Sequence, residues 1–420
     1  RQLAVFAGGC TVEAAEAVVR EDRTGDVFAR IAALIESSLL RHEEDRAGEP
    51  RFRMLETVRE YGLEQVALAG EAAAARQRHA EYFRRLVERQ ARVNPLLEGS
   101  VSVAPLVAEL DNLRLALIWF DEQGDVDALL RVSTALYGLW LTRGRYREGL
   151  QWIARALEQS PQDVPAVRFQ ALLVATNLAV YAGDHPRAAV FVAECLAIAR
   201  QLGDPALMGD ALTNAGYLAY RQGAFGRAEE LLREAQRLFR ERVASNWYGT
   251  LLLLLGDTAL AQEQFDHAAA WYAEAITIIE PTDDSWVLSD AQAGLGGVKV
   301  CTGNLVQAAA LYRQSLDRAQ DQGFTMLVGT SLLGLAAIAV ASGQPETGAH
   351  LLGAAEELAD SLGAPIYPRD RPVRDRGLAA LTATLGEQRL AATRQAGRAL
   401  NVEAAIAEAQ AVAAAIQSSP

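Results

Sequence analysis

The sequence repeats itself about every 40 residues through its central half, and this period limits the possible fold more than any other feature. A short turn-like triplet, which begins with Gly in five copies and with Glu in one, recurs with its starts 39 and then 40 residues apart. The six triplets are Gly144-Arg145-Tyr146, Gly183-Asp184-His185, Gly223-Ala224-Phe225, Glu263-Gln264-Phe265, Gly303-Asn304-Leu305 and Gly343-Gln344-Pro345. A fixed period of this length predicts a stack of similar units rather than one closed core.

Small residues keep a constant distance from these triplets. Five residues after each start lies Gly149, Ala188, Ala228, Ala268, Ala308 or Gly348, and seven residues before the last four starts lies Gly216, Gly256, Gly296 or Ala336. Two antiparallel helices can approach closely only where the side chains between them are small. The spacing therefore predicts that each triplet joins two packed helices.

The segments between the triplets have helical apolar spacing, as in Leu212, Ala215 and Ala219. Breakers such as Gly203-Asp204-Pro205 separate one unit from the next. Each unit then reads as helix, tight turn, helix, which resembles a tetratricopeptide repeat lengthened by more than one helical turn. We predict a mainly α fold in which residues 125–365 form about six hairpins of a right-handed α-solenoid, with the first helix of each hairpin on the concave face.

The first 72 residues follow a different pattern. A Gly8-Gly9 stop precedes a helix capped by Thr11, and another helix is predicted over Val27–Glu36. Two short strands, Ser38–His42 and Arg51–Leu55, and a helix from Glu56 follow. Helices followed by a strand hairpin are the order of a winged helix.

The residues Val5–Ala17 and Arg51–Gly62 resemble the winged helix that follows the nucleotide-binding domain in the NB-ARC branch of the STAND ATPases. Long repeats of this kind resemble the sensor regions of bacterial regulators of the AfsR, LuxR and MalT type. In that family the His of a Met-His-Asp motif reads the phosphates of bound ADP, and the matching residues here are Met54, Leu55 and Glu56. Leu55 cannot donate a hydrogen bond, so we expect a core position for it and no nucleotide sensing.

The resemblance implies four parts: a winged-helix domain at 1–72, a helical connector at 73–124, the superhelix at 125–365 and C-terminal capping helices at 366–420. The chain starts at Arg1 without Met, which leads us to expect a fragment of a longer regulator. The missing upstream part is expected to be the ATPase domain.

Composition argues against several other functions. The net charge of -13 opposes nucleic acid binding, and the stretch 27–40 has Arg30 as its only base, so direct DNA binding by this chain is not expected. Lys299 is the sole lysine, so no GxxxxGK[ST] phosphate loop exists. No apolar run reaches membrane-spanning length, and the three cysteines lie far apart, which favours a reducing cytoplasm over a disulfide or zinc framework.

No catalytic residue, cofactor or metal site is predicted. The five histidines are isolated in sequence, which is typical of surface or turn positions. The remaining candidate is the concave face, where polar and aromatic residues gather in the early repeats. These candidate binding residues are Asn177, Tyr181, Thr213, Tyr217, Tyr220, Arg221 and Asp257. Such a mixture suits a peptide terminus or a small polar ligand, although ordinary exposed polarity is the more common explanation of such residues.

The sequence thus predicts a non-catalytic, cytoplasmic sensor and regulatory region of a bacterial transcriptional regulator. It would bind a partner protein, a peptide or a small-molecule effector on the concave face and relay this to the winged helix and the upstream nucleotide-binding domain. The alternative is a scaffold for protein–protein interaction that has no switch.

Overall fold

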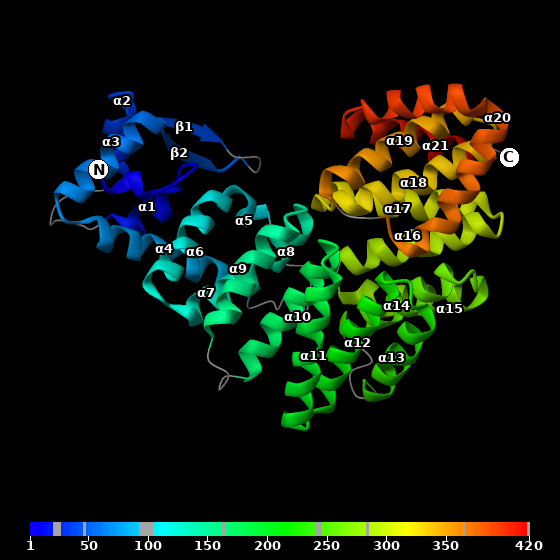
Figure 1. Ribbon diagram of the computed structural model, residues 1–420. Helices are drawn as coiled ribbons and strands as arrows, with labels where there is room; N and C mark the ends of the chain where they lie inside the picture. The colour runs from blue at the N-terminus through cyan, green and yellow to red at the C-terminus, as the bar shows by residue number, and fades with distance from the viewer. Residues whose placement is uncertain are drawn as a thin grey trace. The chain divides into compact units, whose positions relative to one another are not determined.

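The computed structural model describes residues 1–19, 27–44, 48–91, 104–160, 165–239, 246–282, 285–363 and 366–417, and it is helical apart from one strand hairpin (Figure 1). Its contacts divide the chain into two compact units. The first contains Arg1–Arg92, Ser102–Leu139 and Trp152–Pro161, and the second contains Trp140–Gln151 and Gln162–Pro420. The predicted boundary at residue 125 falls inside the first unit, and the four-part division stays a prediction.

The first unit begins with a winged helix. Its elements are η1 (Gln2–Val5), α1 (Val12–Val18), α2 (Val27–Glu36), β1 (Leu40–Glu44), β2 (Pro50–Met54) and α3 (Glu56–Leu68). The Thr11 hydroxyl caps α1 by accepting a hydrogen bond from the Ala14 N–H at 3.2 Å. The strands pair antiparallel with Leu40 opposite Met54. The predicted start of β1 at Ser38 is two residues early, because Ser38 has a φ of +57° and ends the turn after α2.

Four further helices complete the first unit: α4 (Ala72–Ala91), α5 (Ala104–Ala108), α6 (Leu110–Gln123) and α7 (Val126–Ala135). Asn112 of α6 is fully buried, accepts a hydrogen bond from the Ala7 N–H at 2.8 Å and donates one to the Gly9 carbonyl at 2.9 Å. The side chain thereby satisfies two backbone groups at the Gly-Gly stop of the winged helix. Helix α6 is consequently fixed to the winged helix by polar contacts as well as by packing.

His79 of α4 lies in the same contact region between α6 and the winged helix. Its ring lies 3.2 Å from the Asn112 amide oxygen and 5.1 Å from the Phe6 ring, and the residue is 3% exposed. The surface position predicted for this histidine is wrong, because α4 packs this face against α6 and η1. Burial lowers its pKa to about 4, so the imidazole is neutral at physiological pH.

The second unit is built from helical hairpins. Helices α8 (Tyr137–Thr142) and α9 (Tyr146–Gln159) are each divided between the two units. The paired helices that follow are α10 (Pro165–Tyr181) with α11 (His185–Leu202), α12 (Pro205–Arg221) with α13 (Phe225–Leu238), α14 (Asn246–Ala261) with α15 (Phe265–Ile279), α16 (Ser285–Cys301) with α17 (Leu305–Gln322), and α18 (Thr325–Ala341) with α19 (Pro345–Leu362). A 3-10 turn, η2 (Glu280–Thr282), follows α15. From α10 to α18 each first helix also contacts the first helix of the next hairpin. The predicted tetratricopeptide-like solenoid is confirmed.

The hairpin turns and close approaches also agree with the repeat. All six triplet starts have a positive φ, a conformation that favours Gly, and Glu263 adopts it at +57°. A Cβ added to Gly256 would lie 2.7 Å from a Tyr272 ring carbon, and one added to Gly216 would lie 2.7 Å from Leu232. The small residues are therefore required by helix contact.

The chain ends with η3 (Pro368–Asp370), α20 (Arg371–Arg398) and α21 (Val402–Gln417). Helix α20 runs alongside α16 and α18 (Figure 1) and is kinked at Gly386, where φ is +70°. Leu381, Leu390 and Ile406 of these helices join the hydrophobic core of the last two hairpins. Among the described residues, no single helix is long and apolar enough to cross a membrane.

Candidate binding site on the inner face of the repeats

The first helices of the hairpins are buried on nearly all sides. Every residue of α12 from Gly209 to Arg221 is buried, whereas α13 buries only one stripe, Ala228, Leu231, Leu232 and Ala235. A helix that is buried all round has neighbours on both faces. On the inner face of α14 and α16 these neighbours are η3 and the start of α20. The part of the predicted binding face on α14 and α16 is therefore covered by the chain's own C-terminal segment.

Two of the predicted binding residues use their polar groups within their own helices. The Asn177 amide donates to the Leu173 carbonyl at 3.1 Å, and the Thr213 hydroxyl donates to the Gly209 carbonyl at 2.8 Å. Tyr181 is buried, and its ring stacks on that of Tyr146 at 5.2 Å. A binding role for these three residues stays a prediction.

Three of the other four predicted residues, Tyr220, Arg221 and Asp257, meet the C-terminal segment directly, and Tyr217 lies beside Arg221. The Arg221 guanidinium lies 3.2 Å from the Tyr217 hydroxyl and 4.8 Å from the centre of the Tyr367 ring. The Tyr220 hydroxyl accepts a hydrogen bond from the backbone N–H of Arg369 at 3.0 Å. Asp257 contacts the Arg369 side chain. The structure thus brings together residues from α12 and α14 around one short turn.

We call the residues Tyr367–Asp370 the inner turn, and we call Tyr220, Asp257, Tyr272 and Asp290 the Arg369 socket. Arg369 has no exposed surface, and its Nη1 lies 2.7 Å from Asp257 Oδ1. Its Nη2 donates to Asp290 Oδ1, and the Tyr272 hydroxyl donates to Asp257 Oδ1 at 2.8 Å. A charged side chain from beyond the repeats is therefore held by the inner helices α12, α14 and α16 and by the outer helix α15.

Three carboxyl groups surround Arg369. Besides Asp257 and Asp290, Asp370 lies 3.5 Å from Arg369 Nε. Burial raises the pKa of Asp257 to about 6 and that of Asp370 to about 7, although Arg369 acts in the opposite direction. Burial alone would lower the pKa of Arg369, but the carboxylates outweigh it and raise that pKa well above the usual value. The socket accordingly favours a cation.

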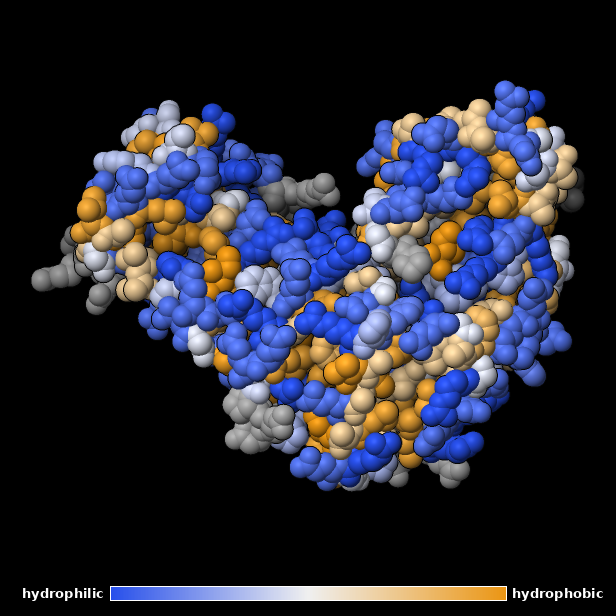
Figure 2. Space-filling model, in the orientation of Figure 1, coloured by the Kyte–Doolittle hydropathy of each residue, from blue (hydrophilic) through white to orange (hydrophobic). Residues whose placement is uncertain are grey.

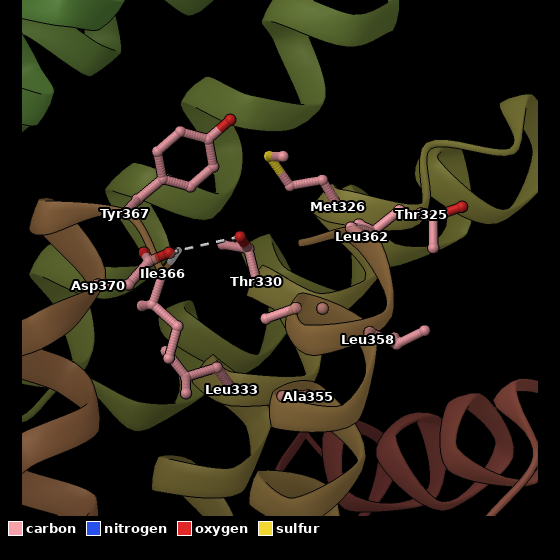
Figure 3. Close-up of a pocket in the computed structure, with 12 residues that line it drawn as sticks. Thr325, Met326, Thr330, Leu333, Ala355, Leu358, Leu362, Ile366, Tyr367 and Asp370 are labelled. Atoms are coloured by element: carbon pink, nitrogen blue, oxygen red, sulfur yellow. Dashed lines mark hydrogen bonds between the residues drawn. The ribbon is translucent and has the colours of Figure 1, made fainter. Parts of the chain in front are cut away.

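A pocket adjoins the inner turn between α18 and α19 (Figure 3). It has an empty volume of about 420 Å³, which includes open solvent. Most of its wall is apolar, with Leu333, Leu358 and Ile366 among its lining residues. The Thr330 hydroxyl donates to Asp370 Oδ2 at 3.4 Å, as the dashed line in Figure 3 shows. The pocket gives a small group access to one side of the inner turn.

Sequence reasoning missed the residues that complete this site, namely Tyr272, Asp290, Tyr367, Arg369 and Asp370. Gly297 lies one 40-residue period after Asp257 and therefore belongs to the inner face, and Asp290 lies two helical turns before it, so extending the face by seven residues would have found Asp290. Arg369 gave no such signal, because it lies outside the repeat period. Within the described ranges, no group of three or more His, Cys, Asp or Glu residues could hold a metal ion.

The predicted sensor position of the winged helix lies in the first unit. Leu55 is the residue before α3 and is 41% exposed, and its side chain makes no cap hydrogen bond. The core position expected for Leu55 is therefore wrong, because the start of α3 lies at the surface of the unit.

Comparison with known proteins identifies the N-terminal part. Residues 1–67 match the family of winged helix-turn-helix domains. HTH-type transcriptional regulators of Mycobacterium bovis and Mycobacterium tuberculosis are 30% identical over 352 residues. The alignment covers 80% of this chain and 38% of the relatives, so the chain spans well under half of their length.

Two solved structures resemble parts of the fold at low identity. One is a STAND protein with a tetratricopeptide repeat sensor from Pyrococcus horikoshii, at 13% identity and a TM-score of 0.43, covering 94% of this chain and 64% of that one. The other is a Rap protein complexed with competence and sporulation factor, at 15% identity and a TM-score of 0.45, covering 79% and 96%.

Proposed function

We propose that this chain is the non-catalytic sensor and regulatory region of a bacterial transcriptional regulator that acts in the cytoplasm. A partner protein, a peptide or a small ligand binds the inner face of the repeats, and the change is relayed to the winged helix and to a nucleotide-binding domain outside this chain. The observation that carries the proposal is the combination of a regulator-type winged helix with an inner repeat face that gathers Tyr, Arg and Asp.

The inner face suits recognition better than catalysis. Its charged residues are paired with one another, and its phenols lie beside a guanidinium, as Tyr217 lies beside Arg221. Aromatic and arginine side chains are the residues that dominate the energetics of protein interfaces. The inner face therefore carries groups that bind a partner, and the proposal assigns no reaction to them.

The winged-helix unit offers a way to pass a signal. Phe28, Tyr61 and Leu68 of α2 and α3 are 56%, 61% and 81% exposed, and Figure 2 shows such hydrophobic residues among hydrophilic ones on this unit. Exposed apolar groups of this kind suit contact with another domain. The hydrogen bonds of Asn112 fix α6 to the winged helix, so a displacement of α6 would also displace the winged helix.

A deletion in the full-length regulator tests the proposal. Removal of residues 125–365 should change the release rate of bound nucleotide. The inner-face variant Tyr217→Ala should change reporter transcription. Glu230→Ala is the matched control, because this carboxylate lies on the outer helix α13 with 69% of its side chain exposed. If the deletion leaves nucleotide binding and release unchanged, no relay exists, and the scaffold alternative replaces this proposal.

A further inference from the structure

The inner turn lies on the inner face of the repeats as a bound peptide would. It comes from beyond the last hairpin, yet its contacts are with Asp257 and Asp290, which lie 112 and 79 residues away from Arg369 in the chain. Tyr367 has extended backbone angles of −58° and 141°, and η3 after it is a single turn of 3-10 helix. A short segment that presents its side chains to a surface of packed helices contacts them as a peptide ligand would.

Two side chains of the inner turn make most of its contacts. Arg369 enters the socket, and the ring of Tyr367 lies 4.8 Å from the Arg221 guanidinium and 5.0 Å from that of Arg369. Tyr367 is 4% exposed, and its hydroxyl finds no hydrogen-bond partner among the described residues. The inner face therefore holds an aromatic residue that is followed two positions later by an arginine.

Stability alone does not account for this arrangement. A buried ion pair is often no more stabilising than apolar residues of the same volume, because two charges lose their hydration. Here the buried Arg369 Nε also has no hydrogen-bond partner in the described chain. The carboxyl groups of Asp257 and Asp290 meet the two Nη atoms, an arrangement that fits a planar guanidinium better than an ammonium.

We propose that the Arg369 socket is a guanidinium-binding site for the arginine of an effector peptide, and that the inner turn fills it as an internal ligand until the peptide displaces it. The inference rests on the proposed function and names the effector class: a peptide with an aromatic residue two positions before an arginine. The pocket between α18 and α19 lies beside the inner turn and provides the side from which it is displaced.

Displacement has a quantitative requirement. A segment tethered to its own site has an effective concentration in the millimolar range, so a free peptide must outcompete it. Weakening the inner turn without changing the socket should then increase binding of a peptide added in solution. The native segment itself supplies the probe.

The test uses a dye-labelled heptapeptide, Ile-Tyr-Pro-Arg-Asp-Arg-Pro, which copies residues 366–372, and fluorescence anisotropy with the whole 420-residue chain. The Arg369→Ala variant should bind this peptide at least tenfold more tightly than the unmodified chain does. A second peptide in which citrulline replaces the first arginine should bind the variant at least tenfold more weakly. Equal affinity for the two peptides, or equal affinity of the two proteins, would overturn the proposal.

A second variant keeps the test decisive if Arg369→Ala does not fold. Tyr367→Ala removes the inner-turn ring that lies 4.8 Å from the Arg221 guanidinium and leaves every socket residue and every charge in place. It should bind the arginine peptide several-fold more tightly than the unmodified chain, and no gain in affinity would again refute the inference. The peptide-binding assay requires neither nucleotide nor transcription. A negative result in it would therefore count against this inference, whereas a failure of the relay in the proposed function would appear in the nucleotide-release experiment.

Discussion

Removing the Arg369 side chain should destabilise the repeat unit more than removing any exposed arginine. In Arg369→Ala, the carboxylates of Asp257 and Asp290 lose their cation, although their side chains are only 3% and 7% exposed. Breaking a buried pair by deleting one partner costs about 3–5 kcal/mol, because the remaining charge stays out of water. We expect a value near the lower end, since Asp257 and Asp370, whose pKa values are already raised, can take up protons in the variant.

Arg376→Ala is the matched control for this prediction. Arg376 lies in α20 seven residues later and pairs with Glu263 at 2.8 Å, but the two side chains are 44% and 57% exposed. An exposed pair of this kind contributes about 0–1 kcal/mol. The two variants therefore compare a buried with an exposed arginine that each pair with a carboxylate of the repeats.

Hydrogen exchange measured by mass spectrometry is the suitable assay, since a stack of repeats can unfold in steps. A loss of about 3 kcal/mol should accelerate exchange of the amides in α14 and α16 by roughly 100-fold in Arg369→Ala. Arg376→Ala should accelerate it by less than about fivefold. If the two variants exchange alike, the socket does not hold the inner helices together and the reasoning from buried charge is wrong.

Three further predictions follow from the geometry. Glu263→Gly should raise the free energy of unfolding by about 1 kcal/mol in chemical denaturation, because Gly adopts a positive φ without strain; a loss of stability would contradict this. Gly256→Ala should lower it by about 1–3 kcal/mol through a clash with Tyr272, whereas Gly226→Ala, with open space around it, should not lower it. Asp370→Asn should flatten the pH dependence of the melting temperature. A carboxyl whose folded pKa is raised to about 7 contributes its full stabilisation of the folded chain below about pH 4 and loses that contribution as the pH rises through 7. An unchanged melting profile from pH 4 to 8 would refute the last point.

The sequence by itself determined the repeat architecture, because its signals are local. A positive φ at the hairpin turn favours Gly, which begins five of the six turns, and close helix packing demands a small residue such as Gly256, which recurs in four of the six copies. The winged helix was predictable for the same reason, from the Thr11 cap and the alternation of helix and strand signals. Small errors arose where a single residue departed from its usual conformation, as at Ser38.

Only the tertiary structure decided what the inner face contacts. Tyr220 and Asp257 could be assigned to the inner face from the period, but their partner Arg369 lies outside the repeats, and no spacing rule connects it to them. The burial of His79 and the exposure of Leu55 were likewise decided by which helices pack over them. Periodicity fixes which face of a helix points inward, whereas the occupant of that face depends on where a distant segment of the chain folds back.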